Sequence, residues 1–168
     1  EDKKHFNILY YLYFYNGGGV AAGDINNDGL TDLYFTANSK GNNKLYLNKG
    51  NFQFEDISSK AGVAGSSDWC SGVTMADVNG DGLDDIFAGG GAYQWGRIFI
   101  QGGDGKYIGK DLGTGEKIGE DAAAIFFDAD GDIDIDLLLL SGSSEYGHSS
   151  SLNVPRLYLN NGKGDFSF

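Results

Sequence analysis

Residues 24–32 read DINNDGLTD, and this acidic stretch recurs twice along the chain. The related stretches DVNGDGLDD and DADGDIDID begin at Asp77 and Asp128, 53 and 51 residues further along. In each stretch, acidic or amide side chains occupy alternate positions of a nine-residue segment. Carboxylates this close together repel one another at neutral pH. We therefore interpret the three segments as loops that hold a cation.

The residues around the acidic segments repeat as well. A short apolar run precedes each segment, a second follows it, a third comes next, and an aromatic-rich run ends the period after a glycine turn. The third runs are KLYLN at 44–48, RIFIQ at 97–101 and RLYLN at 156–160. One period of about 50 residues thus holds four short strands, with the acidic loop between the first and second.

Four-stranded units with this period are typical of β-propeller blades, which bury their faces by stacking on one another. Sustained helical spacing of apolar residues is absent, and glycine interrupts most windows. We predict an all-β propeller segment over residues 1–168, with about three four-stranded antiparallel blades at roughly 17–62, 70–115 and 121–168. The aromatic run at 6–19 is interpreted as a strand that completes or flanks the first blade.

Three blades are too few for a closed ring, since propellers have about four to eight. We therefore expect the segment to belong to a larger propeller, which further blades or other chains complete.

The loop spacing predicts three sites for a hard cation. Oxygen ligands at positions 1, 3, 5 and 9 favour Ca²⁺, which accepts about six to eight oxygens in irregular geometry, over Mg²⁺, which requires a stricter octahedron. Position 7 is expected to supply a backbone carbonyl. The candidate ligands are Asp24, Asn26, Asp28, Leu30 and Asp32; Asp77, Asn79, Asp81, Leu83 and Asp85; and Asp128, Asp130, Asp132, Asp134 and Asp136.

Position 6 of each loop is expected to turn sharply. Gly29 and Gly82 occupy it in the first two loops, and glycine favours such a turn because it has no Cβ. The third loop has Ile133 there, which predicts a more strained turn or a weaker site.

An EF-hand shares the opening of this pattern and is the obvious alternative. It requires a bidentate glutamate at position 12 and flanking helices. Here position 12 is Phe35, Ala88 or Leu139, each inside an apolar run, and the acidic residue stands at position 9 instead. Solvated acidic turns without an ion are the other alternative, but three copies in register argue against them.

The formal charge of −12 and the pI near 4.3 argue against a basic patch for nucleic acid or anionic membranes. No run of apolar residues reaches the length of a transmembrane helix. Cys70 is the only cysteine, which excludes an intrachain disulfide, and its setting in DWCSGV predicts a small buried thiol.

The pattern GVAAGDINNDGLTD, followed by strand residues, resembles the FG-GAP/VCBS repeat, the calcium-loop blade of integrin α propellers. The stretches NKLYLNKGNFQFEDISSKAGV and WCSGVTMADVNGDGLDDIF are similar to bacterial proteins of the ASPIC/UnbV (CRTAC1-like) group. This resemblance implies a Ca²⁺-stabilised propeller on a secreted or surface-anchored protein, either extracellular or associated with the bacterial outer membrane. It implies little about a ligand.

Three functions fit these features. The first is a module that binds a protein or a glycan through its loops, with Tyr93, Trp95 and Tyr146 as exposed aromatic candidates. The second is a polysaccharide-active enzyme, for which Glu145 and His148 in SGSSEYGHSSS are the acid–base candidates. The third is a structural subunit of an outer-membrane assembly. We expect no catalysis, because the strong polar patterns all lie in the cation loops.

Overall fold

The computed structural model describes residues 18–38, 41–65, 67, 69–115, 117, 119–142 and 153–168. Their strands form three four-stranded sheets in which every pairing is antiparallel. The predicted all-β fold with three four-stranded units is therefore confirmed. The first sheet contains β1 (Val20–Gly23), β2 (Asp32–Phe35), β3 (Lys44–Asn48) and β4 (Phe54–Asp56); the second β5 (Val73–Ala76), β6 (Asp85–Ala88), β7 (Arg97–Gly102) and β8 (Lys106–Asp111); the third β9 (Ala123–Phe127), β10 (Asp136–Leu140), β11 (Arg156–Asn160) and β12 (Phe166–Ser167).

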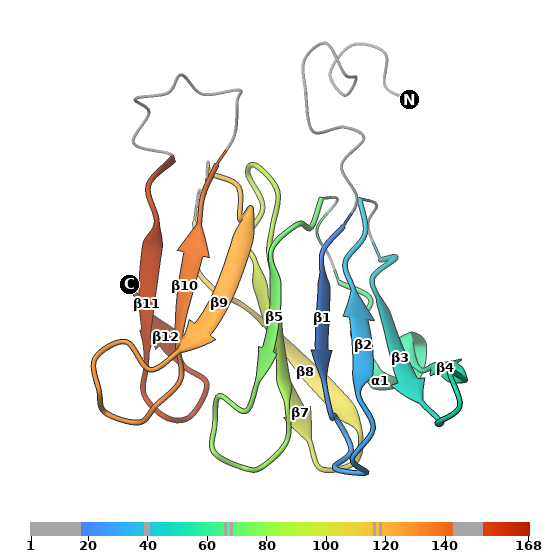
Figure 1. The fold of residues 1–168 in the computed structure, drawn as a ribbon. Helices are drawn as coiled ribbons and strands as arrows, with labels where there is room; N and C mark the ends of the chain where they lie inside the picture. The colour runs from blue at the N-terminus through green and yellow to red at the C-terminus, as the bar shows by residue number, and fades with distance from the viewer. Residues whose placement is uncertain are drawn as a thin grey trace, which may run out of the picture.

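The strands of each sheet follow chain order from one edge to the other. Each acidic loop joins the first strand of its sheet to the second, as the sequence predicts. All three loops lie along one edge of the molecule (the lower edge in Figure 1).

The three sheets stand next to one another through their first strands. β1 contacts β5, and β5 contacts β9, so the second sheet lies between the other two. Figure 1 shows an open row of blades rather than a closed ring. A single turn of helix, α1 (Ser58–Ala61), follows β4, and Gly62 ends it with a φ of 78°. Among the described residues, no helix is long and apolar enough to cross a membrane.

The central strand β6 is buried on both faces, which explains its unbroken apolar run. Ile86 packs with Tyr34, Leu45 and Phe99 in the core between the first and second sheets. The next residue, Phe87, points to the other side and packs with Ile98, Leu137 and Leu139 against the third sheet. Alternating side chains of one strand thus join two blade interfaces.

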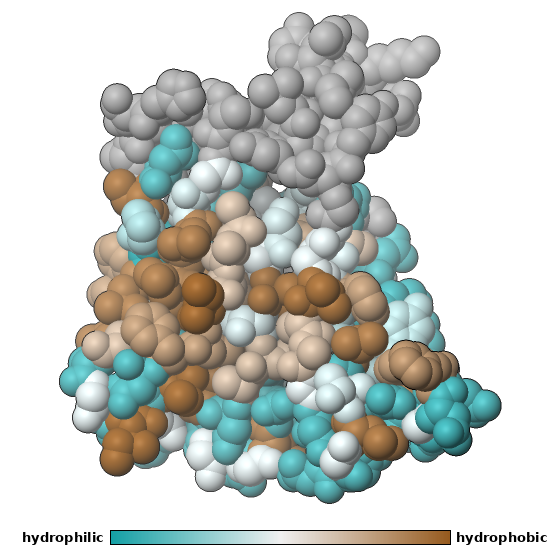
Figure 2. Space-filling view, viewed as in Figure 1, coloured by the Kyte–Doolittle hydropathy of each residue, from teal (hydrophilic) through white to brown (hydrophobic). Residues whose placement is uncertain are grey.

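The outer face of the third sheet stays apolar and exposed. Ile125 is 50% exposed, and Leu140, Leu157 and Leu159 are 38–39% exposed. Apolar side chains also gather across the face formed by β1, β5 and β9, whereas hydrophilic residues line the edge with the acidic loops (Figure 2). The third sheet therefore has an apolar face of the kind that the first two interfaces bury.

Candidate metal sites

The aspartate at position 9 braces each acidic loop against its sheet. Asp32 is fully buried, and its carboxylate accepts hydrogen bonds from the backbone N–H of Ile25 at 3.0 Å and of Asn48 at 2.7 Å. One bond holds the loop and the other holds the end of the third strand. The same pair of bonds recurs in the other sheets, from Val78 and Gln101 to Asp85 and from Ala129 and Asn160 to Asp136.

The aspartates at positions 1 and 5 shape the loop itself. Asp24 accepts hydrogen bonds from the N–H of Asp28 at 3.1 Å and of Gly29 at 2.7 Å, and Asp28 accepts one from Leu30 at 2.8 Å. The second loop repeats this pattern through Asp77 and Asp81. In the third, Asp128 receives the N–H of Ile133 and Asp132 that of Asp134. These side chains therefore shape each loop through hydrogen bonds to its own backbone.

Position 6 has a left-handed backbone in all three loops. The φ angle is 82° at Gly29, 84° at Gly82 and 81° at Ile133, so the third loop forces a β-branched residue into the conformation that glycine has elsewhere. Position 4 has a positive φ as well, at 57° in Asn27, 73° in Gly80 and 85° in Gly131. We did not predict this second turn, although asparagine and glycine at that position are a readable signal.

The third loop brings three carboxylates together. Ligand oxygens of Asp128, Asp130 and Asp136 all lie within 4.8 Å of one another, and this is the one such group of acidic side chains within the described part of the chain. Two oxygens on one Ca²⁺, at about 2.3–2.6 Å each, lie at most about 5 Å apart, so the group fits a shared ion. Asp132 and Asp134 are not part of it. In the first two loops, position 3 is an asparagine, Asn26 or Asn79.

The electrostatics of the loops also fit a cation. Burial raises the pKa of Asp85 to about 6; the two backbone hydrogen bonds oppose this shift, and the negative charges of Asp81 and Asp77 add to it. The pKa of Asp32 is raised in the same way, by burial and by its neighbours Asp28 and Asp24. Each loop thus contains carboxylate repulsion that a bound cation would relieve.

The first two loops also touch one another. Asn27 donates its side-chain N–H to the carbonyl of Gly82 at 2.9 Å, and the N–H of Asp24 donates to the Asp84 carboxylate at 3.1 Å. That carboxylate fills the space where a Cβ on Gly23 would lie. Burial raises the pKa of Asp84, and the charge of Asp24 adds to the shift. Sequence reasoning missed Asp84, because the other two loops have Thr31 and Ile135 at its position.

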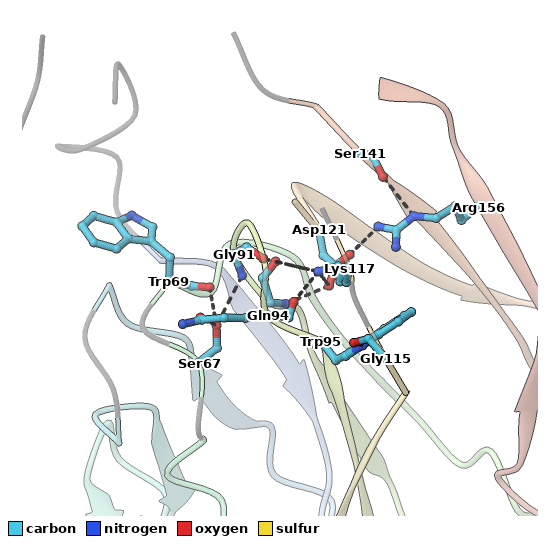
Figure 3. Close-up of polar contacts among 11 residues, drawn as sticks. Ser67, Trp69, Gly91, Gln94, Trp95, Gly115, Lys117, Asp121, Ser141 and Arg156 are labelled. Carbon is cyan, nitrogen blue, oxygen red and sulfur yellow. Dashed lines mark hydrogen bonds and ion pairs between the residues drawn. The ribbon is translucent and has the colours of Figure 1, made fainter. Parts of the chain in front are cut away.

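A second polar cluster lies at the opposite end of the sheets, between the second and third blades (Figure 3). Asp121 is fully buried and contacts Lys117 at 2.8 Å and Arg156 at 2.5 Å. Lys117 is 3% exposed and also donates to the carbonyls of Gly90 at 3.2 Å and Gln94 at 2.6 Å. Burial lowers the pKa of Lys117, and the Asp121 carboxylate opposes that shift. The cluster joins the β6–β7 connection to the start of the third blade and to β11.

The remaining candidate residues from the sequence differ in how exposed they are and in whether they lie among the described residues. Tyr93 is 66% exposed, whereas the Trp95 ring packs beside Gly113 and donates its indole N–H to Gly115 at 2.9 Å. Cys70 is 1% exposed, as predicted, and burial raises the pKa of its thiol. The run at 6–17 and the loop with Glu145, Tyr146 and His148 lie outside the described residues.

Four-stranded antiparallel blades of this kind, each with an acidic loop between its first two strands, define a propeller-type repeat. A family model described as an FG-GAP-like repeat matches residues 24–88. Residues 24–88 thus match an FG-GAP-like repeat, and the resemblance drawn from the sequence is confirmed.

The chain is also similar to cartilage acidic protein 1 of three animals. It is 39% identical to the Xenopus tropicalis protein over 105 residues, which is 60% of this chain and 16% of that protein. It is 31% identical to the Mus musculus and Homo sapiens proteins over 145 and 148 residues, or 84% and 85% of this chain. These matches span 22% of the mouse and human proteins, so the chain corresponds to less than a quarter of its relatives' length.

Proposed function

We propose that this chain is a calcium-binding segment of a β-propeller in a secreted or cell-surface protein, where it serves protein or glycan binding, as in cell adhesion, or acts as a scaffold. The observation that supports this most directly is the group of Asp128, Asp130 and Asp136, which lies in a loop whose sequence pattern occurs three times in the chain. The FG-GAP-like match and the similarity to an acidic protein of cartilage support the same view.

The proposed ion joins the residues that already brace each loop. Position 9 contacts both the loop and the third strand, so an ion held there would strengthen the turn between the first two strands. Three sites are proposed, with the ligands Asp24, Asn26, Asp28, Leu30 and Asp32; Asp77, Asn79, Asp81, Leu83 and Asp85; and Asp128, Asp130, Asp132, Asp134 and Asp136. Ca²⁺ suits these oxygen donors better than Mg²⁺.

We also propose that further blades complete the ring, next to units at roughly 17–62, 70–115 and 121–168. The exposed apolar face with Ile125, Leu140 and Leu157 supports this, because the equivalent faces of the first two sheets are covered. The greater length of the relatives agrees with it.

An extracellular location is favoured over a bacterial outer-membrane assembly, since the matched relatives are frog, mouse and human proteins. A polysaccharide-active enzyme remains the second function class. Its candidates, Glu145 and His148, lie outside the described residues, and no feature of the described ones favours it. Release of reducing sugars from glycans by the purified protein would favour that class.

Calorimetric titration of Ca²⁺ into chelator-treated protein tests the proposal. We expect about three ions per chain, a weaker response to Mg²⁺, and the loss of one ion in Asp128→Asn, since position 1 is an aspartate in all three loops. Lys163→Asn, a change at an exposed turn of the same blade, serves as the control. Absence of binding, or a stoichiometry of one ion per chain, would refute the three-site proposal.

A further inference from the structure

A cavity of about 390 Å³ opens between the first and second blades, on the side of the acidic loops. Its lining includes the apolar residues Ile25, Leu47, Ile57 and Leu83 and two lysines of the first blade, Lys49 and Lys60. Leu47 and Ile57 are half-buried and pack against the core between the two blades. The volume lies at the small end of the range typical of small-molecule sites, about 300–1,000 Å³.

The neighbouring blade interface shows that this opening is not a general consequence of the fold. Gly105, in the β7–β8 turn, and Gly164, in the β11–β12 turn, occupy the same position after their third strands. A Cβ on Gly164 would meet Ile100 at 2.7 Å and Val78 at 3.5 Å, so the third blade closes against the second. No atom lies within 4 Å of such a Cβ on Gly105. The second blade therefore leaves its equivalent junction with the first blade open.

The cavity lining contains lysines, which are uncommon in this acidic chain. Asp104 pairs with Lys106 at 3.0 Å, which leaves Lys49, Lys60 and Glu55 as the other charged side chains of the lining. None of these three has an ion pair within the described part of the chain. The four charged side chains of the lining sum to zero, and an excess of one positive charge remains once Lys106, which lies outside the lining, is counted against Asp104.

We propose that this cavity binds a small amphipathic carboxylate, with its apolar chain on Leu47, Ile57 and Leu83 and its carboxylate between Lys49 and Lys60. The half-buried apolar side chains favour an apolar body, because covering them removes their surface from water. The two lysines favour an anionic head, and Glu55 disfavours a second one. Ile25, Asn26 and Leu83 of the first two acidic loops also belong to the lining, so the cavity borders the proposed calcium sites.

Titration with sodium octanoate, followed by two-dimensional NMR of the ¹⁵N-labelled chain, tests this site. We expect shifts confined to the cavity lining and binding about tenfold tighter for octanoate than for octanamide, which has the same body without the charge. Acetate, which lacks the apolar body, is expected not to bind. Lys49→Gln with Lys60→Gln should abolish the difference between octanoate and octanamide, while Lys163→Gln, an exposed lysine of the third blade, should preserve it.

Gly103→Leu should close the cavity and abolish binding of both ligands, because a side chain at Gly103 has open space in front of it. Gly142→Leu is the matched control, since that glycine also has open space but lies far along the chain from the cavity. The lysine variants stand at exposed positions, so they keep the test independent of how Gly103→Leu folds. Equal binding of octanoate and octanamide, tighter binding of octylammonium, or octanoate binding that survives closure of the cavity would each overturn the proposal.

Discussion

Single residues in the acidic loops adopt backbone conformations that most side chains resist. Ile133 has a φ of 81° and a side chain that is 85% exposed, so it has left-handed strain without much burial to offset it. For an L-residue this conformation costs about 1–2 kcal/mol. The glycines at the same position of the other loops avoid that cost.

Ile133→Gly should therefore stabilise the protein, by about 1 kcal/mol in urea-induced unfolding with chelator present. The gain comes from relief of the left-handed strain, less the greater flexibility of glycine in the unfolded chain. Gly82→Ala, at a φ of 84°, is the reverse control and should destabilise by a similar amount. If Ile133→Ala stabilised as much as Ile133→Gly, backbone strain would not be the cause.

The raised pKa of Asp85 predicts an unusual pH dependence of the free energy of unfolding in the absence of metal. Its pKa is raised to about 6 in the folded protein, above the value of about 3.9 in an unfolded chain. The folded state therefore binds more protons between these pKa values, and stability should fall as the pH rises from about 4 to 6, by about 2–3 kcal/mol. Urea unfolding in chelator across this range measures the slope. Asp85→Asn should flatten it, and a rising slope in the wild type would contradict the assignment.

The acidic loop as an element has two layers of support. The aspartates at positions 1 and 5 fold the turn through backbone N–H groups, and the buried aspartate at position 9 ties the turn to the third strand. All of these bonds join protein groups, so they hold the loop in a shape that places its acidic side chains together. A cation that binds the folded loop would stabilise the native state by mass action.

Asp81→Asn separates the hydrogen-bonding role of position 5 from its negative charge. The amide oxygen can still accept the N–H of Leu83, while the charge is lost. With excess Ca²⁺ we expect a loss of about 1–2 kcal/mol in stability, because the second site loses an anionic ligand. With chelator the change should be nearly neutral or slightly stabilising, as it removes repulsion of Asp85. Thermal unfolding under both conditions measures the difference, and equal destabilisation in both would argue against an ion at this loop.

At the scale of the whole molecule, the blades are joined by more than their apolar cores. Asn160 of the third blade donates to the carbonyl of Val78 at 2.6 Å near the acidic loops. At the opposite end, Asp121 joins Lys117 and Arg156. The second and third blades are thus fastened at both edges.

Asp121→Asn should destabilise the chain by about 3–5 kcal/mol, because it leaves Lys117 buried without its counter-ion. The control is Lys110→Gln, which breaks the exposed ion pair with Asp165 between the same two blades and should cost at most about 1 kcal/mol. Chemical unfolding of both variants provides the comparison. Similar effects for the two would show that burial of the Asp121 cluster adds nothing to the interface.

The sequence by itself determined the four-stranded period, the place of each acidic loop and the need for a special backbone at position 6. These features follow from local spacing: alternation defines strands, and oxygen side chains with glycine define a turn. Cys70 as a buried thiol also followed from its neighbours.

Only the tertiary structure decided which partners those residues meet. Asp32 reaches Asn48, Asp24 reaches Asp84, and Asp121 reaches Arg156, 35 residues away. The same is true of the cavity between the first two blades, which depends on how far the β7–β8 turn stands from Leu47. A repeat pattern predicts the conformation of each blade. The contacts between blades depend on side-chain size and burial at positions where the repeats differ, so local spacing does not predict them.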